Sequence, residues 1–89
     1  MLGYYIAIMD FADGIAFPFV AYGSNFYKKF KQMAEEKGEA KIVAEVFDVP
    51  REVLERMRES NLLKMLVKRI ERKEHFDVQQ ELDAALAKR

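Results

Sequence analysis

Few side chains in this 89-residue chain could carry out enzyme chemistry. It contains one histidine, His75, no cysteine and no threonine, and its only serines are Ser24 and Ser60. A lone histidine cannot form the multi-imidazole site typical of zinc enzymes, and both serines are better explained as helix starts. We therefore expect a protein that is not an enzyme and that needs no cofactor and no metal.

The segment 40–59 carries a pattern suited to a different chemistry, the recognition of DNA bases. A small residue is flanked by apolar ones, a turn residue follows, and two apolar positions anchor a second helix: Val43, Ala44, Phe47, Asp48, Val49, Leu54 and Met57. This pattern resembles the helix-turn-helix motif of small transcription regulators. In that motif two short helices cross on an apolar contact, and the second enters the major groove.

The resemblance implies a reading helix whose exposed face carries both charges. Arginine side chains there would pair with guanine edges, and lysines further along the chain would contact phosphates. The implied nucleic-acid-binding residues are Arg51, Glu52, Glu55, Arg56, Lys64 and Lys68. The resemblance thus implies a small DNA-binding regulator.

The overall charge does not favour nucleic acid. Fifteen basic residues balance 15 acidic ones, so the phosphate-neutralising attraction that dominates DNA affinity is weak. One local exception is the predicted helix 61–75, with Lys64, Lys68, Arg69, Arg72 and Lys73. A basic helix face can contact nucleic acid, an anionic membrane surface or an acidic partner, and it is also common as a solvated face.

The first 23 residues predict an aromatic β-hairpin. The dipeptide Asp13-Gly14 favours a two-residue type I′ turn, since both central residues of that turn need positive φ. Residues 4–12 and 15–22 then pair with Asp10 opposite Phe17. In this register Phe17 and Phe19 share a face with Tyr4, Ile6 and Ile8, and the other face carries Tyr5, Met9, Phe11, Val20 and Tyr22.

Both hairpin faces are apolar, and Pro18 falls at a pair without hydrogen bonds. Because proline has no N–H to give to a further strand, any third strand should add beside residues 4–12, leaving 15–22 as an edge. An open edge with two apolar faces predicts a homodimer or docking on a larger protein. The predicted interface residues are Tyr5, Phe11, Phe17, Phe19, Val20 and Tyr22.

The remaining residues, 24–89, read as a charged body of four or five short helices. Ser24 begins a helix over 25–37 that stops at Gly38. Asp48 caps a second helix, which runs through 59 with Pro50 in its first turn. Ser60 or Asn61 begins a third helix, and Asp77 begins the last one. Residues 39–49 fit a helix and, over 41–47, also a third strand. Helix is slightly favoured, and a strand there would remove the scaffold of the helix-turn-helix hypothesis.

These observations predict one α+β domain over 1–89, consisting of the N-terminal β-hairpin and four or five short helices. No Lys or Arg precedes Lys28 and Asp10 interrupts the apolar stretch, so we expect neither a signal peptide nor a membrane span, and a cytoplasmic protein. Two functions remain: a helix-turn-helix regulator that binds double-stranded DNA and dimerises through the hairpin, and a non-enzymatic protein-protein interaction or assembly module.

Overall fold

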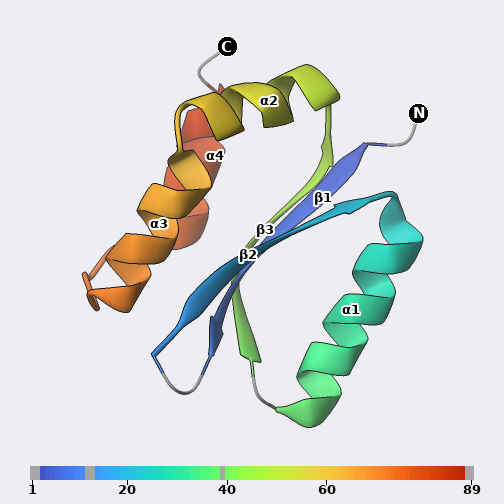
Figure 1. Cartoon of the computed structure of the whole chain (residues 1–89), viewed down its shortest axis with the longest axis vertical. Coiled ribbons are helices and arrows are strands. Elements are labelled where there is room, and N and C mark those ends of the chain that lie inside the picture. Colours follow the sequence, from blue (N-terminus) through green and yellow to red (C-terminus); the bar gives the residue numbers. More distant parts are fainter. Residues whose placement is uncertain (1–2, 12–13, 39, 88–89) are drawn as a thin grey trace.

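Helices cover both faces of a three-stranded antiparallel sheet, which makes the fold α+β (Figure 1). The computed structural model describes residues 3–11, 14–38 and 40–87. In chain order the elements are β1 (Tyr4–Phe11), β2 (Ala16–Tyr22), α1 (Ser24–Lys37), β3 (Ala40–Val49), α2 (Arg51–Glu59), α3 (Leu62–Glu71) and α4 (Val78–Ala87). Strands and helices therefore alternate, and the predicted helical body of 24–89 contains a strand.

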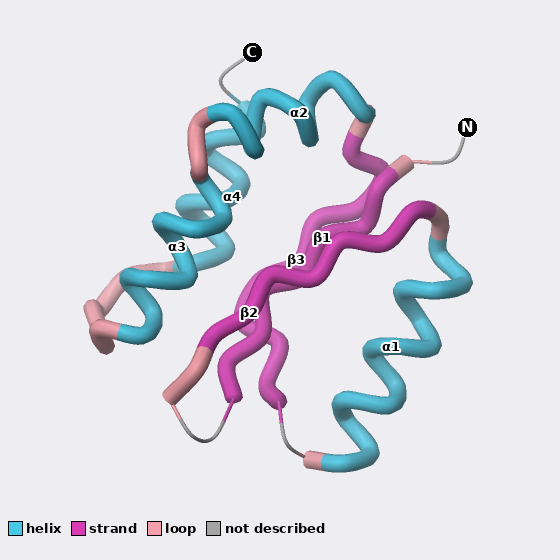
Figure 2. The backbone as a smooth tube through the Cα atoms, in the orientation of Figure 1, coloured by secondary structure: helices cyan, strands magenta, loops and turns pink. Residues whose placement is uncertain are grey.

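The sheet has the strand order β2-β1-β3, with α1 on one face and α2, α3 and α4 on the other (Figures 1 and 2). On the three-helix side, α3 packs beside β2 and α4 beside β3. The third strand adds next to β1, as the position of Pro18 predicted, so β2 is an edge strand. None of the helices in the described ranges is long and apolar enough to cross a membrane.

The hairpin register differs by one residue from the predicted one. The Phe11 N–H donates to the Ile15 carbonyl at 2.8 Å and Gly14, with φ 86°, donates to Phe11, so the loop is one residue longer than a type I′ turn allows. Asp10 therefore lies opposite Ala16 instead of Phe17. A shift of one residue moves every side chain of β2 to the opposite face of the sheet relative to β1. Phe17 and Phe19 therefore face α1, and Val20 and Tyr22 face the other helices.

Residues 40–49 form β3, which corrects the preference for a helix there and confirms the alternative of a third strand. Its pairing with β1 is irregular at two places, where β3 contains an extra residue. One extra residue is Val43, and the other lies near Asp48, whose φ is 53°. These bulges break the alternation of the strand. Ile42, Glu45 and Phe47 contact the α1 side, whereas Val43, Ala44, Val46 and Val49 pack toward the other helices.

The two faces of the sheet bury clusters of different size. Beneath α2, α3 and α4 lies the larger one, which includes the fully buried Ile6, Ile8 and Leu82. Beneath α1 lies a small one around Ala7, Ala21 and Tyr27. Most of the hydrophobic stabilisation is therefore on the three-helix side, and α1 leaves more aromatic surface exposed.

Most of the predicted helix boundaries agree with the structure, and two differ. Gly38, with φ 63°, ends α1, and the Asp77 carboxylate accepts the Gln80 N–H at 3.1 Å to begin α4. Ser24 is the first residue of α1 and makes no capping hydrogen bond. Pro50 directly precedes α2 in extended backbone, because Asp48 belongs to the irregular end of β3.

A side chain of α4 closes the outer edge of β3. The Gln79 amide accepts the Glu45 N–H at 2.8 Å and donates to the Glu45 carbonyl at 2.8 Å. This two-point contact reproduces the hydrogen bonds that a neighbouring strand would form. Gln79 therefore protects β3 from pairing with another chain.

Replacing Gln79 with Ala is expected to lower the free energy of unfolding by about 1–3 kcal/mol, since two hydrogen bonds to a half-buried peptide group are lost. The exposed edge of β3 should also increase self-association. Urea unfolding and sedimentation velocity measure the two effects. Gln80→Ala, a truncation on the exposed side of the same helix, is the control. Equal behaviour of the two variants would contradict the protective role of Gln79.

Candidate interaction groove at the open edge of the sheet

The open edge of β2 presents four peptide groups to the side away from β1. Phe11 and Ile15 form a hydrogen-bonded pair, and antiparallel strands alternate inward and outward peptide groups from such a pair. The outward groups therefore belong to Ala16, Pro18, Val20 and Tyr22. Any chain that extends the sheet at this edge must bind to them.

Half of this edge cannot accept another strand. The Ala16 N–H donates to Oε2 of Glu71 on α3 at 3.2 Å, and Pro18 has no N–H. The half formed by Val20 and Tyr22 lacks both of these blocks. We call it the upper half of β2, because it lies toward the top of Figure 1.

An open cavity of about 270 Å³ lies beside this edge, between β2 and the turn from α2 to α3. Its walls are mainly apolar, and the residues around it are Pro18, Val20, Met57, Arg58, Asn61, Leu63 and Lys64. The turn is fixed by Asn61, whose backbone has the left-handed φ of 57°. Ligand pockets for whole small molecules usually measure about 300–1,000 Å³, so this volume better suits an apolar side chain. We call the cavity and the upper half of β2 the edge groove.

The edge groove has a cationic rim. Arg58, near the end of α2, and Lys64, in the first turn of α3, are both exposed and line the cavity. No carboxylate of the described residues lies within ion-pair distance of either. Lys68, one turn further along α3, is also exposed. This rim can attract carboxylates.

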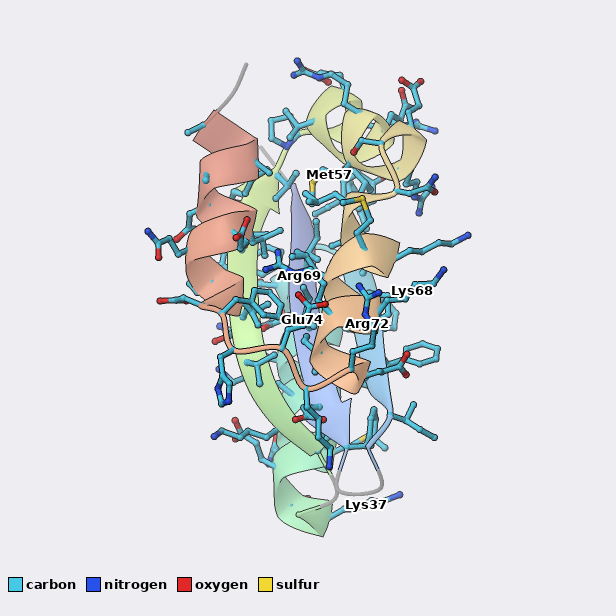
Figure 3. All side chains as sticks on the ribbon, turned by 90° about the vertical axis from the view of Figure 1, so that its left-hand side faces the viewer. Lys37, Met57, Lys68, Arg69, Arg72 and Glu74 are labelled. Atoms are coloured by element: carbon cyan, nitrogen blue, oxygen red, sulfur yellow. The ribbon has the colours of Figure 1, made fainter. Side chains whose placement is uncertain are left out.

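The two arginines of the predicted basic helix are neutralised by neighbouring carboxylates (Figure 3). Arg69 contacts Glu74 at 3.0 Å and Glu81 of α4 at 3.5 Å, and it lies over the ring of Phe76. Hydrogen bonding to Glu74 raises the pKa of Arg69. Arg72 pairs with Glu74 at 3.1 Å. These arginines join α3 to the segment leading into α4.

The structure does not contain the helix pair that the helix-turn-helix resemblance implies, because its first helix is strand β3. The predicted reading residues Arg51, Glu52, Glu55 and Arg56 are exposed on α2. Arg51 pairs with Glu55 at 3.4 Å along the helix, and Arg56 lines a second cavity, of about 220 Å³, between α2 and α4. Lys64 lies apart from them, at the edge groove.

The six predicted interface residues are divided between the two faces of the sheet. Tyr5 and Phe19 are half-buried under α1, where Phe19 stacks on Phe30 with ring centroids 3.9 Å apart, and Phe11 is half-buried in β1. Val20 lines the edge groove. Tyr22 lies against Tyr4 and Phe17 is exposed.

Two large apolar residues on the predicted apolar face of α1 are exposed. Phe26 is 72% exposed and Met33 is 55% exposed. Their spacing of seven residues places them on one side of the helix. They lie outside the edge groove.

A polar cluster connects α1 to β3. The Tyr27 hydroxyl donates to the Glu45 carboxylate, and Nζ of Lys31 lies 3.2 Å from the same carboxylate. The rings of Tyr5 and Phe47 pack against Tyr27 and against each other, with centroid separations of 5.3–5.7 Å. Because the rings fill the space between them and the charges are paired, we assign this cluster a structural role.

The stability of the protein is expected to fall at alkaline pH through Tyr27. Burial, then the hydrogen bond to Glu45 and its negative charge, raises the pKa of Tyr27 well above its usual value. The neutral hydroxyl therefore contributes stability that is complete below about pH 10 and is lost as the pH rises toward the folded-state pKa. Tm measured from pH 8 upward should fall more steeply for the wild type than for Tyr27→Phe. The exposed control Tyr22→Phe should follow the wild type, and parallel curves for Tyr27→Phe would refute the assignment.

No protein-family model matches this chain, and no curated protein or solved structure is significantly similar to it.

Proposed function

We propose that this chain is a non-enzymatic protein-protein interaction module that binds an extended segment of another polypeptide in the edge groove. The segment pairs with the outward peptide groups of Val20 and Tyr22 and places one apolar side chain in the cavity beside Pro18. Adding a strand to a sheet edge supplies affinity through the main chain, and a neighbouring pocket supplies specificity. The observation that carries this proposal is the apolar cavity lined by Pro18 and Val20, at the point where the unblocked half of the edge begins.

Three observations favour this function over DNA reading. The helix that would precede the reading helix is a strand, and Arg51 is already paired with Glu55. In addition, the chain has no net charge to attract phosphates. An interaction module requires no preceding helix, no unpaired Arg51 and no net positive charge, because an extended peptide binds to an edge strand and a neighbouring cavity.

The test is selection of short random peptides displayed on phage against the intact protein. Peptides should be enriched, and adding one of them should shift the amide NMR signals of Val20, Tyr22 and Lys64. Leu63→Trp, which fills the cavity, should abolish binding. Met65→Trp places the same ring on the exposed face of α3 and should retain it. Circular dichroism confirms that both variants are folded.

Two results would overturn the proposal. The first is enrichment that survives Leu63→Trp, or NMR shifts confined to elements outside the groove. The second is duplex DNA binding that weakens between about 50 and 200 mM salt without any peptide enrichment, since this salt dependence is characteristic of phosphate contacts. The second result would return the assignment to a DNA-binding protein.

A further inference from the structure

The charge of the edge groove specifies the chemistry of its partner, and this inference rests on the proposed function. We infer that the bound segment is acidic, with carboxylate side chains flanking the apolar residue that enters the cavity. Arg58 and Lys64 line the cavity from two different helices, and no acidic side chain among the residues that the structure describes lines it. The whole chain has equal numbers of acidic and basic residues, so this excess of positive charge is local to the groove.

The hairpin end of the edge has the opposite sign. Glu71 lies there, and its carboxylate already accepts the Ala16 N–H. A bound acidic segment would be repelled by Glu71 and attracted by Arg58 and Lys64. The charges and the blocked peptide groups therefore select the same half of β2, so the segment is short and lies along Val20 and Tyr22.

The phosphates of a nucleic acid could pair with Arg58 and Lys64, but a nucleic acid does not match the apolar cavity or the edge of the strand. The apolar residues that line the cavity are Pro18, Val20, Met57 and Leu63, and a phosphate backbone has no apolar side chain to place among them. The outward peptide groups of the strand also match another peptide, which carries donors and acceptors at the same repeat. A peptide with both acidic and apolar residues uses every feature of the groove.

The experiment compares three fluorescent peptides that share a central Val-Leu-Val and are flanked on both sides by pairs of Glu, Gln or Lys. Fluorescence anisotropy at low salt measures their affinity for the intact protein. The Glu peptide should bind about fivefold more tightly than the Gln peptide, as expected for two partly exposed ion pairs, and the Lys peptide should bind most weakly. Arg58→Glu with Lys64→Glu should reverse this order.

The matched control changes two exposed arginines outside the groove, Arg51 at the start of α2 and Arg72 directly after α3. Arg51→Gln with Arg72→Gln should keep the wild-type order, whereas Arg58→Gln with Lys64→Gln should make the Glu and Gln peptides equal. This comparison separates a local effect of the groove from a general effect of net charge.

The failure of this inference is distinguishable from the failure of the proposed function. If all three peptides bind equally well and Leu63→Trp abolishes this binding, the acidic preference is overturned and the interaction module remains. A preference for Glu that survives the double Glu variant would also overturn the inference. Absence of binding by every peptide up to about 1 mM would overturn both. Duplex DNA that binds more tightly than the Glu peptide, and is lost in the double Glu variant, would assign the groove to nucleic acid.

Discussion

Truncation of Leu82 to Ala is expected to lower the free energy of unfolding by about 2–5 kcal/mol. The Leu82 side chain is fully buried between α4 and the sheet, in the same cluster as Ile6 and Ile8. A domain of this size has a total stability of roughly 5–13 kcal/mol, so the loss is a large fraction of it. Urea unfolding followed by circular dichroism gives the change directly.

Met65→Ala is the matched control for Leu82→Ala. It also shortens an apolar side chain on a helix, but Met65 is 55% exposed, so the change should stay within about 0.5 kcal/mol. Because α4 also carries Gln79, weakened docking of α4 should increase self-association through the edge of β3. A cost below about 1 kcal/mol for Leu82→Ala would contradict the docking of α4 on the sheet.

The elements that were predicted from the sequence depend on short-range chemistry. Gly38 can end a helix because it adopts the left-handed conformation, and Asp77 can begin one because its carboxylate reaches an N–H three residues later. Pro18 likewise determines locally which side of β2 can accept a strand. Each of these signals acts over a few residues, so neighbouring residues are sufficient to read it.

The sequence of β3 fits both a strand and a helix, because its bulges interrupt the alternation of buried and exposed residues that identifies a strand. The residues that pack on the three-helix side are spaced by one, two and three positions, at Val43, Ala44, Val46 and Val49. A regular strand would show strict alternation, whereas Ile42, Val46 and Val49 are spaced as on one face of a helix. In the structure the bulges place Ile42 on the α1 side of the sheet and Val46 and Val49 on the other side. Four positions of the helix-turn-helix resemblance are explained by burial, because Ala44, Val49, Leu54 and Met57 all belong to one core cluster. Phe47 is 54% exposed and faces α1 instead.

The edge groove could not be predicted as a site, because it unites residues distant in sequence. Val20 was expected at a protein interface and Lys64 at a phosphate, and the structure places both around one cavity. Their proximity depends on the packing of α3 beside β2 and on the turn at Asn61. Neither the packing of α3 on β2 nor the turn at Asn61 produces a recognisable pattern in the sequence of the hairpin.

Replacement of Gly3 by Val is expected to cost about 3 kcal/mol, because there is no space for a side chain. A Cβ at this position would lie 2.7 Å from the Cα and carbonyl carbon of Asp48, which are backbone atoms. The Gly3 carbonyl also accepts the Gly23 N–H at 3.1 Å, just before α1. Gly3 therefore lies where β1 meets both the end of β3 and the start of α1, and displacing it should loosen both contacts.

A second substitution separates this steric effect from a general loss of strand stability. Asp48 has the left-handed φ of 53°, so Asp48→Gly alone should be neutral or stabilising by up to about 1 kcal/mol. In the double variant the more flexible backbone at position 48 can move away from the new side chain. The double variant should therefore be more stable than the sum of the single effects, by urea unfolding. Strict additivity would show that the cost of Gly3→Val does not arise from contact with position 48.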